Sequence, residues 1–182
     1  IRNIIYCKKN EIALFFRLNL KKLLKLKFRI MERTLIILKP AALQRGIVGE
    51  ILSRFEHKGL YFVGMKMMQL DDAILNVHYG HLKEKSFFGD VKVAMSVSPV
   101  IVVCLEGVEA VRVVRTMVGV TNGRNADPGT IRGDYSMSVE QNVIHASDSI
   151  ETAQVEIKRF FKDEELFEAR RSNRSFYYAK YE

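Results

Sequence analysis

The feature that most constrains the fold of this chain is a pair of uninterrupted apolar runs, at residues 34–38 and 99–105. A strand with one face in water alternates apolar and polar residues, whereas an uninterrupted apolar run is typical of a strand covered on both faces. Each run therefore predicts a central strand of a sheet. The first run ends at Pro40, which stops the strand because proline has no N–H to donate to the ladder.

Periodicity and capping residues predict the elements around these two runs. They are a helix at 44–58, a strand at 60–70, short helices at 71–79 and 91–97, a helix at 109–118, a short strand ending at His145 and a helix from Ser149. With the short helices set aside, the order is βαββαβ followed by one more helix. We therefore expect an α+β protein of the ferredoxin-like kind, with helices packed on an antiparallel sheet and an extra C-terminal helix.

Two groups of apolar residues are expected in the interior of this fold. Methionine fills irregular gaps between apolar side chains, so three methionines of the second strand are interpreted as core residues: Met65, Met67 and Met68. The last helix has apolar residues at helical spacing and is expected to bury them: Ile150, Ala153, Ile157, Phe160 and Phe161.

The net charge of +8 is concentrated at the N-terminus. Residues 1–30 contain nine Lys or Arg and one acid, which leaves 20 basic and 20 acidic residues in 31–182. The basic pI therefore gives no support for nucleic-acid binding by the domain. We expect residues 31–182 to form one domain and residues 1–30 to lie outside it, as an over-extended start or an added sequence. A targeting or membrane-surface arm is the alternative.

Cysteine use and hydropathy favour a cytoplasmic protein without a membrane span. Cys7 and Cys104 are the only cysteines, and Cys104 lies inside the second apolar run, where it is interpreted as a small buried residue. No disulfide framework is predicted. No apolar run approaches the roughly 18 residues that a spanning helix needs. The four histidines show no metal-ligand spacing with Cys or Asp.

The first candidate site is the segment 142–149, in which a short apolar run ends at His145 and a Ser-Asp-Ser cluster opens a helix. Asp148 or Ser149 is a suitable N-cap. Glu156 follows on the border of the buried stripe of that helix. A partly desolvated carboxylate there could accept the proton of one ring nitrogen of His145 and leave the other nitrogen nucleophilic. The alternative is a polar turn beside a histidine at the edge of the core.

The second candidate is the loop 119–134, which combines four glycines with Thr121, Arg124 and Arg132. Glycine allows close approach of the backbone, and Thr and Arg donate hydrogen bonds to phosphate oxygens. A structureless loop of this length is usually functional or mobile. The spacing matches neither the Walker loop nor the dinucleotide fingerprint, so a phosphate site is only one interpretation of it.

Three further side chains can reach the same cleft. Lys39 stands just past the first strand, where sheets of related kinds place ligands, although a solvated lysine is the commoner case. Arg115 lies on the shoulder of the helix at 109–118. Of the pair Phe87-Phe88, one ring can pack inward and the other can serve as a stacking platform, although both can also belong to the core.

Taken together, these residues resemble the nucleoside diphosphate kinase family. The resemblance runs from Met31 to about Leu166. The segments that carry it are Gln44-Arg45-Gly46, Val48-Gly49-Glu50-Ile51, His78-Tyr79, Phe87-Phe88, Pro128-Gly-Thr-Ile-Arg-Gly-Asp134 and Asn142-Val-Ile-His-Ala-Ser-Asp-Ser149. The last two segments together are highly specific.

The resemblance implies a ping-pong transfer of the γ-phosphoryl group of ATP or another nucleoside triphosphate to a nucleoside diphosphate, through a phosphohistidine at His145. It implies that Glu156 and Ser147 hold the His145 ring and that Tyr79 lies near it. The nucleotide-binding residues that it implies are Lys39, Phe87, Arg115, Thr121, Arg132 and Asn142, with Phe87 on the base. It also implies a homo-oligomer, either a tetramer or a hexamer.

The resemblance further implies that Mg²⁺ takes part through the nucleotide phosphates. That expectation fits the absence of a carboxylate cluster able to hold the ion without nucleotide. The chain departs from the family where Ala41-Ala42 replaces the usual Asp-Gly, where Ser86 replaces a proline, and where Gly123 replaces a proline after Asn122. The last change is expected to affect the rigidity of the loop and the contacts between subunits.

Two other kinds of protein remain open at this point. One is a ferredoxin-like regulatory or nucleic-acid-binding domain that has lost the transfer reaction, against which the neutral charge of residues 31–182 counts. The other is a basic, membrane-tethered protein in which residues 1–30 provide the attachment.

Overall fold

The computed structural model describes residues 31–168 and 174–179 of the chain. Residues 32–170 form one compact unit, and the four-residue helix α9 (Arg174–Tyr177) lies outside it. The predicted extension at residues 1–30 lies outside the described residues. Within the described ranges, the helices are too short or too polar to cross a membrane.

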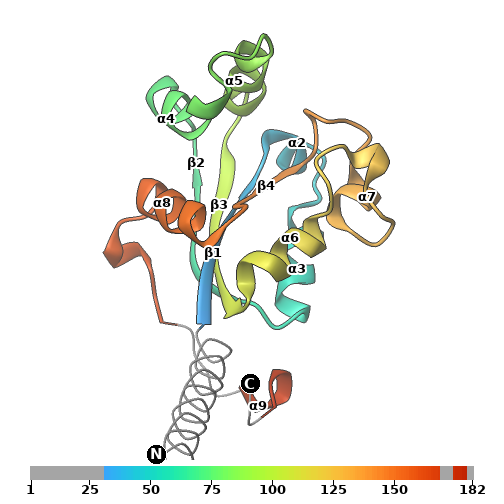
Figure 1. Ribbon diagram of the computed structural model, residues 1–182, viewed down its shortest axis with the longest axis vertical. Helices are drawn as coiled ribbons and strands as arrows, with labels where there is room; N and C mark the ends of the chain where they lie inside the picture. The colour runs from blue at the N-terminus through green and yellow to red at the C-terminus, as the bar shows by residue number, and fades with distance from the viewer. Residues whose placement is uncertain (1–30, 169–173, 180–182) are drawn as a thin grey trace, which may run out of the picture. The chain divides into compact units, whose positions relative to one another are not determined.

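The centre of the compact unit is a sheet of four strands in the order β2-β3-β1-β4 (Figure 1). The strands are β1 (Met31–Leu38), β2 (Tyr61–Met68), β3 (Val100–Val108) and β4 (Ile144–Ala146). β1 pairs antiparallel with β4, with Ile37 opposite His145, and β2 pairs antiparallel with β3. This order, with helices between β1 and β2 and between β3 and β4, confirms the ferredoxin-like α+β fold.

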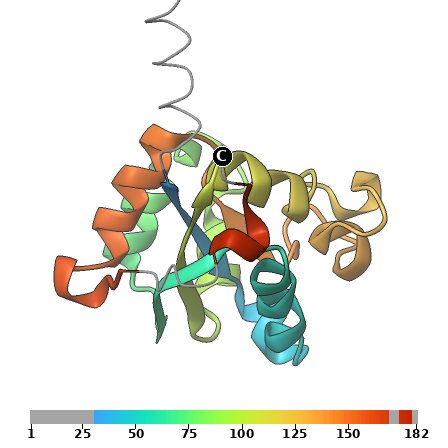
Figure 2. The same ribbon diagram turned by 90° about the horizontal axis from the view of Figure 1, so that it is seen from below.

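Helices cover both faces of the sheet. One face carries α2 (Pro40–Gln44), α3 (Val48–His57), α6 (Ala110–Val118) and α7 (Ile131–Tyr135). The other carries α4 (Asp72–His78), α5 (Phe88–Ser96) and α8 (Ile150–Phe160). In the view of Figure 2, α8 and α4 lie on one side of the strands and α3 and α6 on the other. Short 3₁₀ turns occupy Gly80–Leu82, Gly123–Asn125 and Asp163–Glu165.

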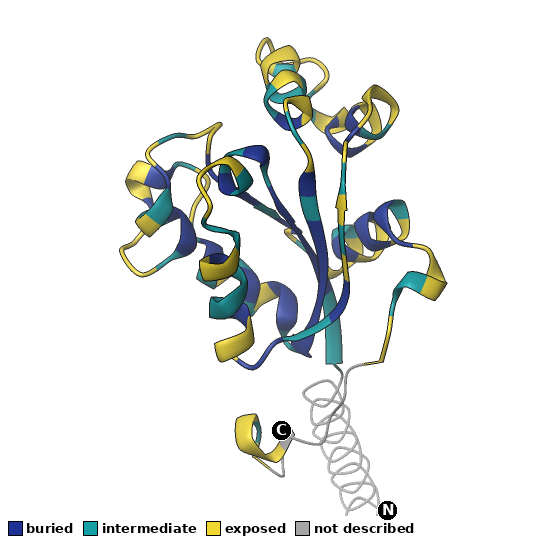
Figure 3. Ribbon diagram, turned by 180° about the vertical axis from the view of Figure 1, so that it is seen from behind, coloured by how far each residue is buried: buried dark blue, intermediate teal, exposed yellow. Residues whose placement is uncertain are grey.

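β1 has the two buried faces that its uninterrupted apolar run predicts. Ile36 and Leu38 belong to the core beneath α3 and α6, whereas Leu35 and Ile37 belong to the core beneath α4 and α8. None of the four side chains is accessible to solvent. The dark blue of the central strands in Figure 3 shows the same arrangement. Cys104 of β3 is also fully buried, and burial raises the pKa of its thiol to about 12.

Several predicted boundaries and burials are wrong, for identifiable reasons. The helix expected at 44–58 is α3 and begins four residues later, at Val48, because Gly46, at φ +67°, breaks the helical path. Pro40 starts a separate short helix, α2, that was not predicted. Met65 and Met67 are 49% and 63% exposed, since they lie on the edge strand where the helices do not cover them.

The prediction for α8 is correct except at its first residue. Ala153, Ile157 and Phe160 are buried, and so is Phe161 directly after the helix. Ile150, however, is 41% exposed because it begins the helix, where the first turn projects beyond the sheet.

The segment after α8 crosses the edge strand β2. Phe167 donates its backbone N–H to the carbonyl of Val63 at 2.7 Å, and Lys66 binds Glu165 at 2.8 Å. At Gly64, an added Cβ would lie 2.8 Å from the side chain of Leu166 and 3.1 Å from that of Phe161. A side chain at position 64 would therefore require Leu166, Phe161 and the backbone carbonyl of Glu165 to shift.

We expect Gly64→Ala to destabilise the protein by about 1–3 kcal/mol, because the added methyl overpacks the contact with Leu166. Gly49→Ala is the matched control. Gly49 lies in α3 with no neighbour within 4 Å of an added Cβ, so alanine there should leave stability unchanged or raise it by up to about 1 kcal/mol. Urea unfolding of both variants measures the difference, and equal effects would contradict the packing argument.

Candidate active site

A cavity of about 1180 Å³ opens between the α4–α5 hairpin, the segment before β4 and the first turns of α8. The structure brings the predicted site residues together around it. Nine of them line the cavity: Lys39, Tyr79, Phe87, Arg115, Thr121, Arg132, Asn142, His145 and Glu156. The tenth, Ser147, is fully buried directly behind Glu156.

β4 is the strand that places His145. Ile144 and Ala146 point into the core beneath α6, so the alternation of a strand directs His145 to the opposite face, where α4 and α8 pack. Val143, immediately before the strand, is buried with φ +56°, a left-handed conformation that is rare for a β-branched residue. Its carbonyl accepts the backbone N–H of Lys39 at 2.9 Å, which joins the end of β1 to the start of β4.

Glu156 holds the His145 ring. His145 Nε2 lies 3.0 and 3.2 Å from the two carboxylate oxygens of Glu156, and Ser147 Oγ donates to Glu156 Oε2 at 2.5 Å. Burial alone would raise the pKa of Glu156, but the hydrogen bonds from His145 and Ser147 and the charge of His145 outweigh burial and hold that pKa below its usual value. An ionised carboxylate accepts the Nε2 proton, so in the neutral form of the imidazole the lone pair is on Nδ1.

Ser147 is fixed from its other side by β1. Its backbone N–H donates to the carbonyl of Leu35 at 3.1 Å, and its hydroxyl lies 3.4 Å from the Leu35 N–H. The helix that carries Glu156 is capped by Ser149, whose hydroxyl accepts from the N–H of Thr152 at 3.0 Å. The serines of the segment 142–149 therefore set both the start of α8 and the position of its carboxylate.

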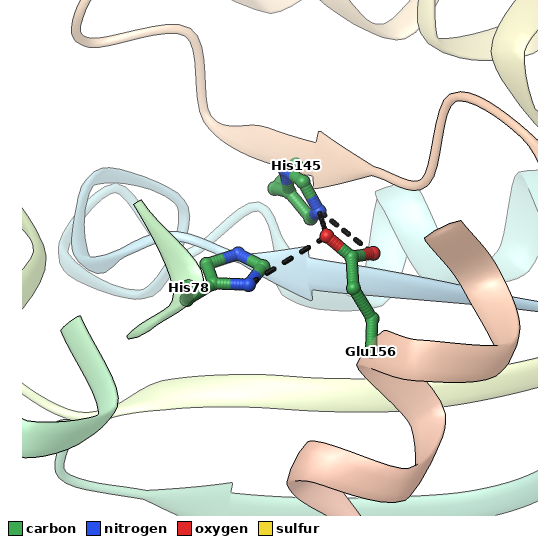
Figure 4. A group of neighbouring side chains, drawn as sticks. All are labelled: His78, His145 and Glu156. Carbon is green, nitrogen blue, oxygen red and sulfur yellow. Dashed lines mark hydrogen bonds and ion pairs between the residues drawn. The ribbon is translucent and has the colours of Figure 1, made fainter. Parts of the chain in front are cut away.

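His78 approaches the same carboxylate from α4. Its Nδ1 lies 3.6 Å from Glu156 Oε1, and its ring meets the His145 ring edge to face at 4.7 Å between centroids (Figure 4). Burial, and then the charge of His145, lower the pKa of His78 to about 3, so His78 is neutral. The predictions gave His78 no role, because its proximity to Glu156 depends on how α4 packs against α8.

His78, His145 and Glu156 are the one group of potential metal ligands among the residues that the structure describes, with ligand atoms within 4.8 Å of one another. Two imidazoles and a carboxylate suit zinc better than Mg²⁺, which prefers oxygen ligands. Arg159 of α8, however, lies 3.0 Å from His78 Nδ1 and brings a fixed positive charge to that position. The arrangement therefore favours hydrogen bonding over metal binding.

Three cationic side chains line the opposite wall of the cavity. Arg132 is buried and donates to the carbonyls of Gly119 and Ile144, both at 2.8 Å, and Arg115 lies 3.5 Å from the carbonyl of Ala146. Burial and the charge of Arg115 lower the pKa of Arg132 to about 10.

Lys39 also lies close to other positive charges. Burial and the charge of Arg132 lower the pKa of Lys39 to about 8, against the opposing effect of Glu140. Cations that destabilise one another in this way attract an anion into the space that they share.

The polar residues around these cations differ in exposure. The Asn142 amide donates to the carbonyls of Val139 at 2.6 Å and Thr121 at 3.3 Å, while its Oδ1 has no partner in the described part of the chain. Thr121 is exposed at the cavity rim. The hydroxyl of Tyr79 is buried without a partner within residues 31–168 and 174–179, and burial raises the pKa of this phenol.

The glycine-containing loop 119–134 is more ordered than predicted, because it contains a 3₁₀ turn and most of α7. Thr130 caps α7 by accepting from the N–H of Gly133 at 3.1 Å, and an added Cβ at Gly133 would lie 2.1 Å from the carbonyl of Asp127. Arg54 of α3 binds Asp134 at 2.6 Å. These contacts fix the helix that carries Arg132.

The two adjacent phenylalanines diverge. Phe88 packs against the core beneath α4 and α8, whereas Phe87 is 47% exposed at the cavity mouth. Phe87 therefore presents a ring to whatever occupies the outer part of the cavity.

Similar proteins were found by sequence. The family model described as nucleoside diphosphate kinase matches residues 32–166. A nucleoside diphosphate kinase of Parabacteroides distasonis is 67% identical over 138 residues, which are 76% of this chain and 90% of that protein. One of Pyrococcus horikoshii is 52% identical over 149 residues, which are 80% of this chain and 95% of that protein.

Similar proteins were also found by structure. A halophilic nucleoside diphosphate kinase from Halobacterium salinarum, solved in complex with CDP, superposes with a TM-score of 0.80 at 38% identity and covers 82% of this chain and 99% of its own. The apo enzyme of Encephalitozoon cuniculi superposes with a TM-score of 0.78 at 37% identity and covers 81% and 99%.

We expect Lys39→Met to stabilise the protein by about 1–3 kcal/mol at pH 7, where the charged ammonium is held in an unfavourable position. The pKa of Lys39 is about 8 in the folded protein and about 10.4 in an unfolded chain. Between these values the unfolded state binds more protons, so the stability of the unaltered protein rises with pH and the advantage of the variant disappears.

Urea unfolding at pH 7 and at pH 10 measures this effect. Lys58→Met, at an exposed position just after α3, is the matched control and should change stability little at either pH. A Lys39→Met advantage that stays constant between the two pH values would show that the lysine charge is not its cause.

Proposed function

Because this chain belongs to the nucleoside diphosphate kinase family, we propose that it transfers the γ-phosphoryl group of a nucleoside triphosphate to a nucleoside diphosphate, with His145 as the phosphoryl carrier. The observation that carries this proposal is the contact of His145 Nε2 with the buried carboxylate of Glu156. That contact keeps the Nδ1 lone pair unprotonated on a residue that lines the cavity.

In the first half-reaction, the Nδ1 lone pair of His145 forms a bond to the γ-phosphorus. The bond from that phosphorus to the bridging oxygen breaks, and its electrons leave with the nucleoside diphosphate. In the second half-reaction, a terminal oxygen of another nucleoside diphosphate attacks the phosphohistidine, and the electrons of the N–P bond return to Nδ1. One cavity can serve both steps because the acceptor binds where the first product leaves.

The cationic side chains of the cavity stabilise the negative charge that spreads over the phosphoryl group during transfer. Phosphoryl transfer gains most from positioning and from positive charge around the equatorial oxygens. We propose that Lys39, Arg115, Thr121 and Arg132 bind the phosphates, that Lys39 and Asn142 also reach the sugar, and that Phe87 stacks on the base. The exposed ring of Phe87 supports the last role, and contact through a π-face accommodates every base.

Glu156, Ser147 and Tyr79 act on the histidine itself. Glu156 stabilises the positive charge that develops on the imidazole when Nδ1 forms its bond, because Nε2 keeps its proton and its carboxylate partner. Ser147 keeps that carboxylate in place through its 2.5 Å contact. Tyr79 lines the same cavity, and its buried hydroxyl has no hydrogen-bond partner among the described residues. We propose that this hydroxyl donates a hydrogen bond near the transferring group.

Mg²⁺ fits this site as a partner of the nucleotide and not as a resident ion. Asp148 and Glu151 line the cavity near the start of α8 and offer oxygen atoms, yet the described residues contain no cluster of carboxylates that would hold the ion alone. When bound, Mg²⁺ neutralises the negative charge of the phosphate oxygens. Mg²⁺ would therefore be held mainly by the phosphate oxygens of the nucleotide, and Asp148 is the side chain that could offer it a further oxygen.

We further propose that residues 31–182 are the kinase domain, with residues 1–30 outside it, and that the chain works as a homo-oligomer in the cytoplasm. The family match over residues 32–166 supports the first part. Exposed apolar side chains on the edge strand, such as Met65 and Met67, support assembly into a tetramer or hexamer.

We expect incubation with γ-labelled ATP and Mg²⁺ to label His145, and a nucleoside diphosphate added later to remove the label as its triphosphate. The label should be acid-labile and base-stable, as a phosphohistidine is. The His145→Ala protein should keep its fold and take no label. Label on another residue, or normal turnover by His145→Ala, would exclude the mechanism.

We expect Glu156→Gln to slow His145 phosphorylation about 100-fold or more, because the amide cannot stabilise the developing imidazolium charge as a carboxylate does. Rapid-quench measurement with labelled ATP gives the rate. Glu164→Gln, at an exposed position in the turn after α8, is the matched control. A Glu156→Gln rate within a factor of two of the control would remove Glu156 from the mechanism.

A further inference from the structure

Arg159 lies nearly one turn after Glu156 on α8, and neither the sequence motifs nor the proposed reaction gives it a role. One of its terminal nitrogens lies 3.0 Å from Nδ1 of the buried His78. His78 in turn lies edge to face against His145 and Phe160, with ring centroids 4.7 and 5.2 Å away. Arg159 is therefore linked to His145 through the His78 ring, which packs against the His145 ring.

The contact with the Arg159 guanidinium determines which ring nitrogen of His78 carries the proton. Arginine has only donors, so His78 Nδ1 must be the acceptor in this contact. The single proton of the neutral His78 ring is then on Nε2. That nitrogen is buried with no hydrogen-bond partner in the described part of the chain. Arg159 thus selects the tautomer that the surroundings of His78 would otherwise disfavour.

The opposite tautomer would change the partners of Glu156. With the proton on Nδ1, His78 could donate a hydrogen bond to Glu156 Oε1. These two atoms are 3.6 Å apart in the structure. Glu156 Oε1 is also the nearer partner of His145 Nε2, at 3.0 Å. The two histidines would then compete for one carboxylate oxygen. The buried His78 ring would gain a hydrogen bond, and His145 would lose part of the contact that orients it.

We propose that Arg159 is a positioning residue that keeps His78 in the Nε2–H tautomer and thereby reserves Glu156 for His145. This inference rests on the proposed phosphohistidine function, since the consequence is a rate of phosphorylation. His78 is the element with two arrangements: it accepts from Arg159 in one and donates to Glu156 in the other. Only the first leaves the carboxylate available to the histidine that carries the phosphoryl group.

The charges around His78 give this arrangement a pH dependence. The titratable and charged groups around it are His145 from β4, Glu156 and Arg159 from α8, His81 from the 3₁₀ turn after α4, and the phenol of Tyr79, whose ring centroid is 4.6 Å away. Glu156 favours protonation of His78, and the two other histidines and the arginine oppose it. Removal of Arg159 therefore raises the pKa of His78. Protonated His78 donates to Glu156 from Nδ1, so phosphorylation should slow as the pH falls.

The test compares Arg159→Leu, Arg159→Lys and the control Lys158→Leu, which removes a positive charge from an exposed position of the same helix. The double variant Arg159→Leu with His78→Phe removes the competitor as well. Long-range ¹H–¹⁵N NMR of the full chain reports the His78 tautomer without nucleotide. Rapid-quench labelling with γ-labelled ATP and Mg²⁺ reports the phosphorylation rate of His145 and the ATP concentration for half-saturation from pH 5.5 to pH 9.

We expect Arg159→Leu to shift His78 toward the Nδ1–H tautomer and to slow phosphorylation about tenfold, which corresponds to about 1.4 kcal/mol. Half-saturation by ATP should change less than twofold. The acidic fall of the rate should move to higher pH. Arg159→Lys should recover part of the rate, the double variant should recover more, and Lys158→Leu should match the unaltered protein.

An Nε2–H tautomer of His78 that persists in Arg159→Leu would overturn the proposal. A slow double variant would also overturn it, because the loss would then come from packing and not from competition for Glu156. If the unaltered protein takes no label on His145, the proposed function fails. The NMR comparison of His78 would still show whether Arg159 selects its tautomer.

Discussion

A carboxylate buried between a helix and a sheet must be supplied with hydrogen-bond donors, and Glu156 is that carboxylate in this molecule. Its two donors lie on one short segment, which is itself joined to a strand more than 100 residues earlier in the sequence. Ser147 reaches it from the end of β4 and is itself held by Leu35 of β1, while His145 reaches it from the middle of β4. Satisfying one buried charge therefore fixes the register of an edge strand, the depth of α8 and the orientation of the histidine.

The cationic wall of the cavity shows the complementary situation. Lys39 and Arg132 have lowered pKa values because they are buried beside other cations. The fold keeps them in place through backbone contacts, such as the two carbonyls that accept from Arg132. The folded chain thus bears an unfavourable charge arrangement that a bound polyphosphate would relieve. In the proposed reaction, less reorganisation would then be left for the transfer itself.

Most predictions that rest on local sequence pattern are correct, such as the central strand. The contacts and burials that depend on packing between distant elements could not be predicted. Thr34–Leu38 identified the central strand, and the spacing from His145 to Glu156 predicted the contact between these two side chains, because strand and helix periods determine both. The contact of Arg159 with His78 was not predicted, because the two residues are 81 positions apart and come together only through the packing of α4 on α8. Met65 and Met67 were wrongly predicted to be buried, because the composition of a strand does not indicate whether it lies at the edge of the sheet.

Val143 sits in a left-handed conformation between the residue assigned to the sugar and the residue assigned to the phosphoryl group. Across it, the N–H of Ile144 donates to the carbonyl of Asn142 at 2.7 Å, a three-residue turn that sets how Asn142 and His145 diverge. Glycine would adopt this backbone without strain, but it would leave the core beneath α6 without a side chain and free the turn to open. Replacing Val143 by glycine would therefore relieve backbone strain and at the same time loosen the fixed divergence of Asn142 and His145.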